Sequence, residues 1–338
     1  MSRAPLRHLT ATIAVAVLVG PTAAQAAART PGSATPAPGQ VRTVVRDAAT
    51  GAPVPRACAA LVPVDAAALT AVTMGEDQVG RGGGCSDEQG VLVSSEVTPG
   101  AYRLLVRPYD ATVHGWQWVG RHGGTGERER AQVVLVHSGA VTDAPNVRLD
   151  PAGTVVGVVT DAATGAPVPR ARVMVVPYVP DPKYDDHGPM TDENGRYTIT
   201  GLGPYRWPVQ FAAAGFATVW SGGVGSRAQA RTVRVRAQQS ATLNQALPVG
   251  TPLTGAVRVD ELLTYAQVIA FDAATGDLAG VADVGDGYLL RLLPGQRVRL
   301  RCDCSYAQPV WHRDAAGFDA ATPVRVRRTP TVVDFDLG

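Results

Sequence analysis

The sequence predicts an all-β protein built from three tandem antiparallel β-sandwiches that follow an N-terminal signal peptide. Two observations support this fold class. The string DAATGAPVPRA occurs at 47–57 and again, without a difference, at 161–171, and identical strings at a domain-sized spacing indicate internal duplication. Apolar and polar residues also alternate along most of the chain, which is typical of strands with one buried and one solvated face.

The alternation continues almost to the end of the chain. Valine and arginine alternate over 233–236, and the same period of two runs through 297–304 and 333–337. After the N-terminal segment we find no stretch with the period expected of a long amphipathic helix. One short helix is expected at 65–71, with Asp65 as its N-cap residue.

Residues 1–26 have the features of a signal peptide. A basic start containing Arg3 and Arg7 is followed by an apolar stretch at 9–19 and by the small-x-small pattern AQA. The apolar stretch is too short to cross a bilayer, which disfavours the alternative of an uncleaved anchor helix. Residues 27–40 are rich in small residues and proline and are expected to form a flexible linker. We therefore expect a secreted, extracellular protein with no membrane span.

Length and charge limit the possible functions. A chain of 338 residues has room for two or three domains. The formal net charge is only +2 and the arginines are scattered, whereas a nucleic-acid groove needs a concentrated basic stripe. We therefore predict no nucleic-acid partner and no cofactor. The sequence does not indicate an oligomeric state.

We place the three repeats at 41–150, 151–249 and 250–338. Their junctions, near 150–152 and 248–250, are expected to be accessible to proteases. The first two repeats share their order of motifs, whereas the third is more degenerate. The third repeat also contains DAATG, but after its second strand instead of before it. We interpret that copy as the same turn chemistry used at another corner.

The second repeat contains the clearest motifs. It begins with GTVVGVVTDAATGAPVPRA at Gly153 and continues with TDENGRYTITGLGP at Thr191. Within the second motif, Asn194 and Gly195 are a strong signal for a two-residue hairpin turn. The first repeat follows the same order, with SDEQG from Ser86 and then TPGAY.

These motifs, G-x-V-x-D-x-x-T-G-x-P-V-x-x-A and then T-D-x-x-G-x-Y-x-I-x-G-L-x-P, resemble the carboxypeptidase regulatory-like domain. The resemblance is strong over 153–247, good over 41–150 and weak over 250–338. It implies a prealbumin-like, Ig-like β-sandwich of about seven strands, grouped with starch-binding-like sandwiches. It also implies an accessory module without chemistry of its own, often secreted, which sometimes binds carbohydrate or protein.

We find no recognisable catalytic motif in the sequence. It lacks G-x-S-x-G, H-E-x-x-H and the phosphate-binding P-loop, and its histidines are scattered. The signal peptide, linker and three accessory-like repeats account for the whole chain. We predict a non-catalytic protein that binds carbohydrate or another extracellular or cell-surface polymer. The alternatives are a structural or adhesive spacer, and a protein associated with polysaccharide hydrolases such as α-amylases that has no visible catalytic residues.

The best candidate for a binding site lies in the first repeat. Trp116 and Trp118 are two residues apart and so share one strand face. They precede a long Gly/Arg/Glu loop at 120–130 for which we see no counterpart in the other repeats. We therefore predict a ligand-binding surface of Trp116, Trp118, Arg121 and His122. The alternative is that each tryptophan closes the core of its own repeat.

No metal site is predicted. Asp181, Asp185 and Asp186 lie in one short loop, and carboxylate oxygens are the ligands that Ca²⁺ prefers. Their spacing is not that of an EF-hand, however, and the prolines at 180 and 182 already explain a stiff polar loop. We therefore favour a solvated hairpin loop.

The four cysteines are expected to form two disulfides, because export implies an oxidising compartment. Cys58 and Cys85 flank one hairpin of the first repeat, and the second repeat lacks both, so we predict Cys58–Cys85. Cys302 would then bond to Cys304, although residues two apart in a straight strand have Cα atoms about 6.6 Å apart, near the upper limit for a disulfide. Two free thiols, or a thiolate metal site with His312 as a further ligand, are the alternatives.

Overall fold

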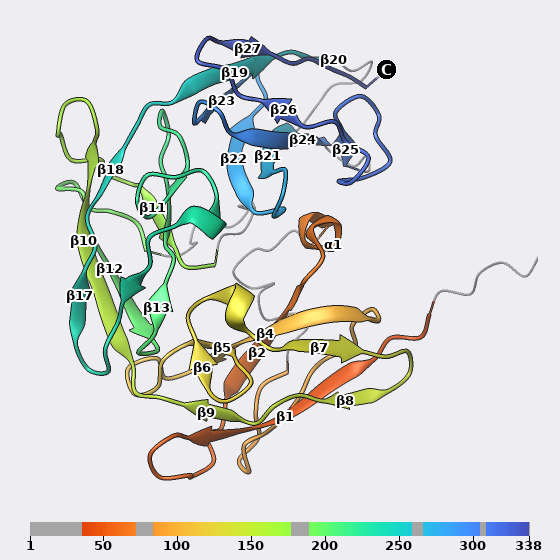
Figure 1. The fold of residues 1–338 in the computed structure, drawn as a ribbon, viewed down its shortest axis with the longest axis vertical. Coiled ribbons are helices and arrows are strands. Elements are labelled where there is room, and N and C mark those ends of the chain that lie inside the picture. The colour runs from red at the N-terminus through yellow and green to blue at the C-terminus, as the bar shows by residue number, and fades with distance from the viewer. Residues whose placement is uncertain (1–35, 72–83, 177–188, 259–265, 305–308, 338) are drawn as a thin grey trace, which may run out of the picture. The chain divides into compact units, whose positions relative to one another are not determined.

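The computed structural model describes residues 36–71, 84–176, 189–258, 266–304 and 309–337. The predicted signal peptide, most of the predicted linker and the polar loop considered for Ca²⁺ lie outside the described residues. Within them the regular secondary structure is almost entirely β-strand (Figure 1), and the predicted class of three tandem β-sandwiches is confirmed. None of the described helices is long and apolar enough to cross a membrane.

The first sandwich consists of two sheets. In one, the order is β3-β1-β8, with β9 also paired to β1; in the other, it is β2-β4-β5-β6, with β7 also paired to β4. The elements are β1 (Gln40–Asp47), β2 (Ala57–Pro63), α1 (Ala66–Ala71), β3 (Val91–Val93), β4 (Gly100–Pro108), β5 (Gln117–Val119), β6 (Gly124–Thr125), the 3₁₀ turn η2 (Arg128–Arg130), β7 (Val133–Val136), β8 (Val141–Asp143) and β9 (Val147–Leu149).

The second sandwich repeats this plan. One sheet has the order β12-β10-β17 with β18 also on β10, a second has the order β11-β14-β15, and β13 pairs with β16. The elements are β10 (Gly153–Asp161), β11 (Arg172–Met174), β12 (Arg196–Leu202), β13 (Arg206–Trp207), β14 (Gln210–Ala212), β15 (Val219–Trp220), η3 (Arg227–Gln229), β16 (Val233–Arg234), β17 (Ser240–Thr242) and β18 (Gln245–Leu247).

The third sandwich keeps the plan, with its opening and closing strands each divided in two. One sheet has the order β23-β19-β27, the pair β20-β28 continues it, and the other sheet has the order β22-β21-β24-β25 with β26 also on β24. The elements are β19 (Thr251–Gly255), β20 (Val257–Arg258), β21 (Ala266–Asp272), β22 (Leu278–Asp283), β23 (Tyr288–Leu292), β24 (Arg297–Cys304), β25 (Val310–Trp311), β26 (Val324–Arg325), β27 (Thr331–Val332) and β28 (Phe335–Asp336).

The sheets are not purely antiparallel. In each sandwich the opening strand pairs in parallel with the closing strands: β1 with β8 and β9, β10 with β17 and β18, and β19 and β20 with β27 and β28. Alternating sequence patterns report which face of a strand is buried, but not the direction of its neighbour. No described sheet joins strands of two sandwiches, and the limits 41–150, 151–249 and 250–338 remain our proposal for the domains.

The duplicated string forms a turn that its own side chains hold. Asp47 Oδ1 accepts hydrogen bonds from the backbone N–H groups of Ala49 and Thr50, at 2.9 and 2.6 Å, and Gly51 takes a positive φ of 73°. These bonds, led by that from Thr50, hold the pKa of the Asp47 carboxyl well below its usual value. The turns from Asp161 and Asp272 repeat this geometry. The last joins β21 to β22, in accord with its interpretation as another corner.

The turn before β12 differs from the prediction. Asn194-Gly195 does not form a two-residue turn; instead the N–H of Gly195 bonds to the carbonyl of Asp192, and the N–H of Asp192 bonds to the carbonyl of Arg196. Asp192 Oδ1 accepts from the N–H groups of Asn194 and Arg196 at 2.9 and 2.8 Å. The aspartate side chain thus favours a three-residue loop with Gly195, at φ 70°, in the left-handed position.

Two local predictions are confirmed. Asp65 Oδ1 accepts the N–H of Ala68 at 2.9 Å and so caps α1. The disulfide Cys58–Cys85 is present, and the two residues face each other across an antiparallel bridge.

The second disulfide is only partly described. Cys302 is also disulfide-bonded, so it is neither the free thiol nor the thiolate metal ligand of the alternatives. The side chain of Cys304 lies outside the described residues, and the pair Cys302–Cys304 stays a prediction.

The first junction is not the accessible linker that we expected. Asp150 Oδ2 accepts a hydrogen bond of 2.5 Å from the hydroxyl of Tyr205, its carbonyl accepts the N–H of Gly115, and Ala152 is 9% exposed. At the second junction Val249 is 41% exposed. The first two sandwiches therefore meet through bonded residues and not through a loose connection.

Candidate binding cleft

The predicted surface in the first sandwich does not form as expected. Arg121 and His122 are exposed and Trp116 is half-buried, but Trp118 is only 2% exposed. A ring that solvent cannot reach cannot stack on a sugar, so the prediction is wrong for Trp118. For Trp116, Arg121 and His122 it stays a prediction. The guanidinium of Arg107 lies 4.7 Å from the centre of the Trp116 ring and covers one of its faces.

Trp118 is buried where the first sandwich meets the second and not in the core of its own sandwich. Along β4, Leu104 and Val106 belong to the core of the first sandwich, whereas Leu105 points to the opposite, outer face. Leu105 pairs with Trp118, and both belong to a buried cluster made largely of residues from the second sandwich. The alternative that each tryptophan closes the core of its own repeat is therefore also wrong for Trp118.

Backbone contacts tighten this interface. The N–H of Trp116 bonds to the carbonyl of Gly201 at 2.7 Å, and its carbonyl accepts the N–H of Gly203 at 2.9 Å. A Cβ on Gly126 would lie 2.3 Å from the carbonyl oxygen of Arg206 and 2.7 Å from the Trp207 ring. The glycines of the 120–130 loop thus allow a close approach to the second sandwich.

The 120–130 loop does have counterparts, contrary to our expectation. Each sandwich has a turn closed by a backbone pair that begins at a tryptophan, and a 3₁₀ or similar turn follows it. These closing pairs are Trp118 with Thr125, Trp220 with Val224, and Trp311 with Ala315. The turn in the first sandwich is three residues longer, which hid the equivalence in the sequence.

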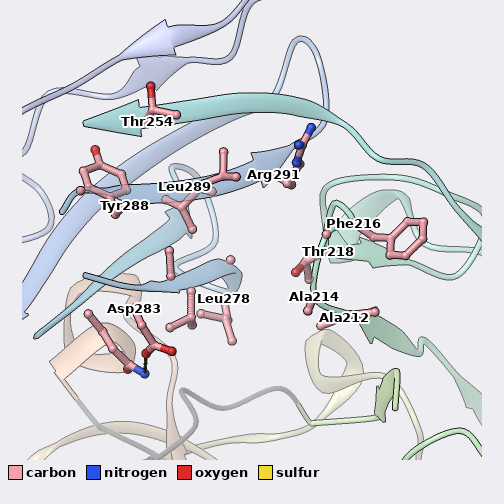
Figure 2. A pocket seen from close by; sticks show the side chains of 18 of the residues that line it. Ala212, Ala214, Phe216, Thr218, Thr254, Leu278, Asp283, Tyr288, Leu289 and Arg291 are labelled. Atoms are coloured by element: carbon pink, nitrogen blue, oxygen red, sulfur yellow. Dashed lines mark hydrogen bonds between the residues drawn. The ribbon is translucent and has the colours of Figure 1, made fainter. Parts of the chain in front are cut away.

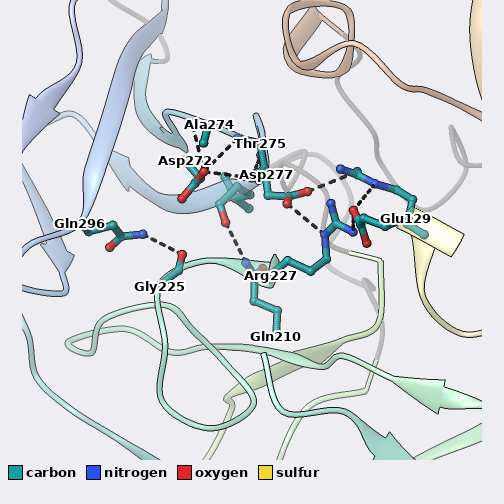
Figure 3. Close-up of polar contacts among 11 residues, drawn as sticks. Glu129, Gln210, Gly225, Arg227, Asp272, Ala274, Thr275, Asp277 and Gln296 are labelled. Atoms are coloured by element: carbon teal, nitrogen blue, oxygen red, sulfur yellow. Dashed lines mark hydrogen bonds and ion pairs between the residues drawn. The ribbon is translucent and has the colours of Figure 1, made fainter. Parts of the chain in front are cut away.

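Charged residues of these turns meet in one buried cluster (Figure 3). Arg227 Nε lies 3.0 Å from Asp277 Oδ2, and these side chains are 5% and 3% exposed. Arg128 Nη1 lies 3.3 Å from Asp277 Oδ1, and Arg227 also pairs with Glu129. Burial alone would raise the pKa of Glu129, but the Arg227 guanidinium lowers it below its usual value. Each of the three sandwiches thus contributes at least one side chain to a single ion-pair cluster.

The outer face of the equivalent sheet is also covered in the third sandwich. Phe271 and Trp311 form a buried cluster against which Ala66 and Ala67 of α1 pack. Arg301, 3% exposed, bonds to the carbonyl of Thr70 at the end of α1.

In the second sandwich the outer face of the equivalent sheet, β11-β14-β15, is only partly covered. At its inner end Gln210 Nε2 donates a 2.7 Å hydrogen bond to the carbonyl of Leu278 in the third sandwich. Further out, a cleft of about 1220 Å³ separates the two sandwiches. This volume exceeds the roughly 300–1,000 Å³ typical of small-molecule pockets.

The cleft exists because small side chains stand where the first sandwich has large ones. Strand register makes Ala212 the equivalent of Arg107, since Ala212 pairs with Arg172 as Arg107 pairs with Cys58. By the same register Thr218 corresponds to Trp116. An arginine–tryptophan stack in one sandwich is therefore replaced by a methyl group and a hydroxyl in the other.

Figure 2 shows the two walls of the cleft. The second sandwich contributes the turn after β14 together with the outer face of β11. The third contributes β22, β23 and parts of β19 and β27. The side chains labelled there are Ala212, Ala214, Phe216 and Thr218 on one side and Thr254, Leu278, Asp283, Tyr288, Leu289 and Arg291 on the other.

The charges that line the cleft are unevenly paired. Asp283 accepts a 2.9 Å hydrogen bond from Gln267 Nε2, and Asp334 pairs with Arg258 outside the cleft. Among the described carboxylates, none pairs with the guanidinium groups of the cleft, those of Arg170, Arg172 and Arg291. Arg291 Nε is buried without a hydrogen-bond partner. Asp286 also lines the cleft, and among the described residues neither it nor Asp283 has an ion-pair partner. Unpaired charges of both signs therefore lie in the cleft, with arginines on both walls and the two aspartates at and beside the edge of β22.

No group of three or more potential metal ligands occurs among the described residues. The cleft itself had no signal in the sequence, since its residues were interpreted as ordinary strand and turn positions. Arg170, inside the duplicated string, has a positive φ of 56° that recurs at Arg56 with 55°, but this marks a shared turn and not a site.

Comparison with protein families finds a match in the second sandwich. Residues 154–248 match the family of the carboxypeptidase regulatory-like domain. No curated protein is significantly similar in sequence. Among solved structures, the minor pilin GBS52 of Streptococcus agalactiae is 14% identical, with 62% of this chain and 95% of that chain covered and a TM-score of 0.26.

Two other solved structures show a similar level of likeness. The shaft pilin SpaA of Lactobacillus rhamnosus GG is 9% identical, with 61% and 97% of the two chains covered and a TM-score of 0.19. The Bacillus anthracis TIE protein is 10% identical with a TM-score of 0.22, and the match covers 89% of this chain but only 51% of that protein. TM-scores at this level support no functional argument. The family match covers one part of the chain, residues 154–248, which make up nearly all of the second sandwich.

Proposed function

We propose that this is a secreted, extracellular, non-catalytic protein that binds carbohydrate or another extracellular polymer in the cleft between its second and third sandwiches. The cleft carries the proposal. It is larger than typical small-molecule pockets, two sandwiches line it, and three of its arginines have no carboxylate partner among the described residues. A cleft of this size fits a segment of a chain better than a small molecule, and its unpaired arginines favour a chain that carries acidic groups.

Export is supported by the disulfide Cys58–Cys85, because disulfides persist mainly in oxidising compartments. A non-catalytic role is supported by the family that the second sandwich matches, because domains of that family are accessory modules.

A pull-down of the purified chain with a panel of insoluble neutral and acidic polysaccharides tests the proposal. We expect retention on at least one acidic polymer, and we expect the double variant Arg170→Gln/Arg172→Gln to weaken it. Arg196→Gln serves as the matched control, because Arg196 is an exposed arginine of the same sandwich that does not line the cleft. The proposal fails if no polymer, peptide chains included, is retained, or if the control variant weakens retention as much as the double variant.

A structural or adhesive spacer is the second candidate. The buried cluster of Arg128, Arg227 and Asp277, and the covered outer sheet faces, favour it because they bind the sandwiches to one another. A spacer needs no occupied cleft, so it is favoured if binding to all polymers is absent.

A further inference from the structure

We infer that the polymer held in the cleft is an acidic polypeptide, which adds as a strand to the free edge of β22. This inference rests on the proposed function and names the chemical class of its ligand. It depends on the direction of the backbone groups of β22, on the shape of the opposite wall and on the unpaired arginines of the cleft.

The edge of β22 presents hydrogen-bonding groups to the cleft. β22 is the outermost strand of its sheet. The N–H of Val284 bonds to the carbonyl of Ala266, and the register pairs Gln267 with Asp283 and Ile269 with Val281. Because bonded and non-bonded pairs alternate in an antiparallel ladder, the N–H and C=O groups of Val281 and Asp283 point away from β21. Both residues line the cleft.

Within the described part of the chain, no backbone group pairs with these outward groups. One outward position of the strand already has a donor from the other wall. The carbonyl of Leu278 accepts the side-chain amide of Gln210, as described above. At this position a polar side chain of the second sandwich thus occupies the edge. Further along, Ala212, Ala214 and Thr218 are too short to do so, and the space remains open.

This arrangement suits an extended peptide better than a sugar chain. A free strand edge offers N–H and C=O groups at the spacing of another peptide backbone. Side chains of an added strand would alternate between two directions. Side chains of one set would face the outer sheet surface of the second sandwich. Those of the other set would lie against the third sandwich.

The arginines of the cleft favour acidic side chains where the peptide passes them, away from Asp283 and Asp286 on the third sandwich. The guanidinium groups of Arg172 and Arg291 line the cleft from opposite walls, and neither has a carboxylate partner among the described residues. Guanidinium groups bind carboxylates with charge-assisted, often bidentate hydrogen bonds. An extended segment with acidic residues at alternate positions would pair with the edge of β22 and would also place carboxylates near the arginines.

The test uses the full chain and blocked synthetic peptides of about eight residues, the length of an ordinary strand. The first peptide alternates Glu and Thr, the second alternates Lys and Thr, and the third is the first with alternate backbone nitrogens methylated. Binding is measured by calorimetry. We expect the Glu/Thr peptide to bind, and backbone methylation to weaken binding by about tenfold or more, because it removes the N–H groups that pair with the edge. The Lys/Thr peptide should bind at least about fivefold more weakly than the Glu/Thr peptide.

Variants of the protein test the same contacts from the other side. Arg172→Gln should weaken binding of the Glu/Thr peptide by about fivefold, and Arg196→Gln should leave it unchanged. Val281→Pro removes an N–H that points outward, so it should weaken binding without breaking the pairing of β22 with β21. If that variant does not fold, the methylated peptide answers the same question.

Two results would overturn the inference: equal binding of the methylated and unmethylated peptides, or no binding of the Glu/Thr peptide. Parallel titrations with soluble acidic polysaccharides separate this failure from failure of the proposed function. Binding of a polysaccharide that depends on Arg172, without peptide binding, refutes strand addition and leaves polymer binding in place. Absence of both kinds of binding refutes both.

Discussion

The ion-pair cluster predicts a large and specific effect of replacing Asp277. The substitution Asp277→Ala removes the carboxylate that lies 3.0 Å from Arg227 and 3.3 Å from Arg128. Asp277 and Arg227 side chains are 3% and 5% exposed, so water cannot replace the lost partner. Removing one member of a buried pair typically costs about 3–5 kcal/mol, because the remaining charge is left buried and uncompensated. Two guanidinium groups are affected here, so we expect a loss in the upper part of that range.

Urea unfolding followed by tryptophan fluorescence measures this loss as a change in the free energy of unfolding. The control is Asp143→Ala, which removes the carboxylate of an ion pair of similar length. Asp143 lies 2.8 Å from Arg42, but the two side chains are 69% and 54% exposed. Water and salt solvate that pair already, so its loss should change the free energy of unfolding far less than the loss of Asp277.

A double-mutant cycle isolates the pair itself. Combining Asp277→Ala with Arg227→Met should cost clearly less than the sum of the two single variants, because the double variant leaves no unpaired guanidinium at position 227. Equal effects of Asp277→Ala and Asp143→Ala, or strict additivity in the cycle, would refute the view that this cluster is buried and coupled.

Three further predictions concern other contacts. Gly126→Ala should lower the melting temperature, because its Cβ would lie 2.3 Å from a backbone oxygen, whereas Gly317→Ala, with nothing within 4 Å, should not. The depressed pKa of Glu129 stabilises the fold above its unfolded value of 4.5, so stability should fall as pH drops below that value, and Glu129→Gln should reduce this dependence in acid titrations followed by circular dichroism. Replacing both Cys58 and Cys85 by serine should cost about 2–4 kcal/mol in the same urea assay, and an unchanged midpoint would contradict a stabilising role.

The parts of the fold that short-range interactions determine could be predicted from the sequence. The Asp47 turn forms from bonds within five residues, so identical strings give identical turns. The Asp65 cap is equally local. Cys58–Cys85 could be inferred because both cysteines flank one hairpin. In each case the partners lie on neighbouring strands or in the same turn.

The candidate site could not be predicted in the same way. Trp118 has the strand position of an exposed aromatic residue, and it is buried in the contact between the first and second sandwiches. The signal for the equivalent turns was present in Trp118, Trp220 and Trp311, each followed by a turn, but the longer first turn concealed it. The cleft depends on how two sandwiches pack and on the absence of large side chains at Ala212 and Thr218. The alternation of apolar and polar residues within a strand shows neither how two sandwiches pack nor where a space is left between them.

The parallel pairing of opening and closing strands has a mechanical consequence. Tension applied to the two ends of the first sandwich enters at the start of β1 and leaves at the end of β9, which run side by side in the same direction. Pulling then shears the two strands along their length, so the hydrogen bonds between them share the load and must break together. An antiparallel arrangement of the same strands would place both pulling points at one end and open like a zip. A chain of such modules is therefore built to withstand stretching.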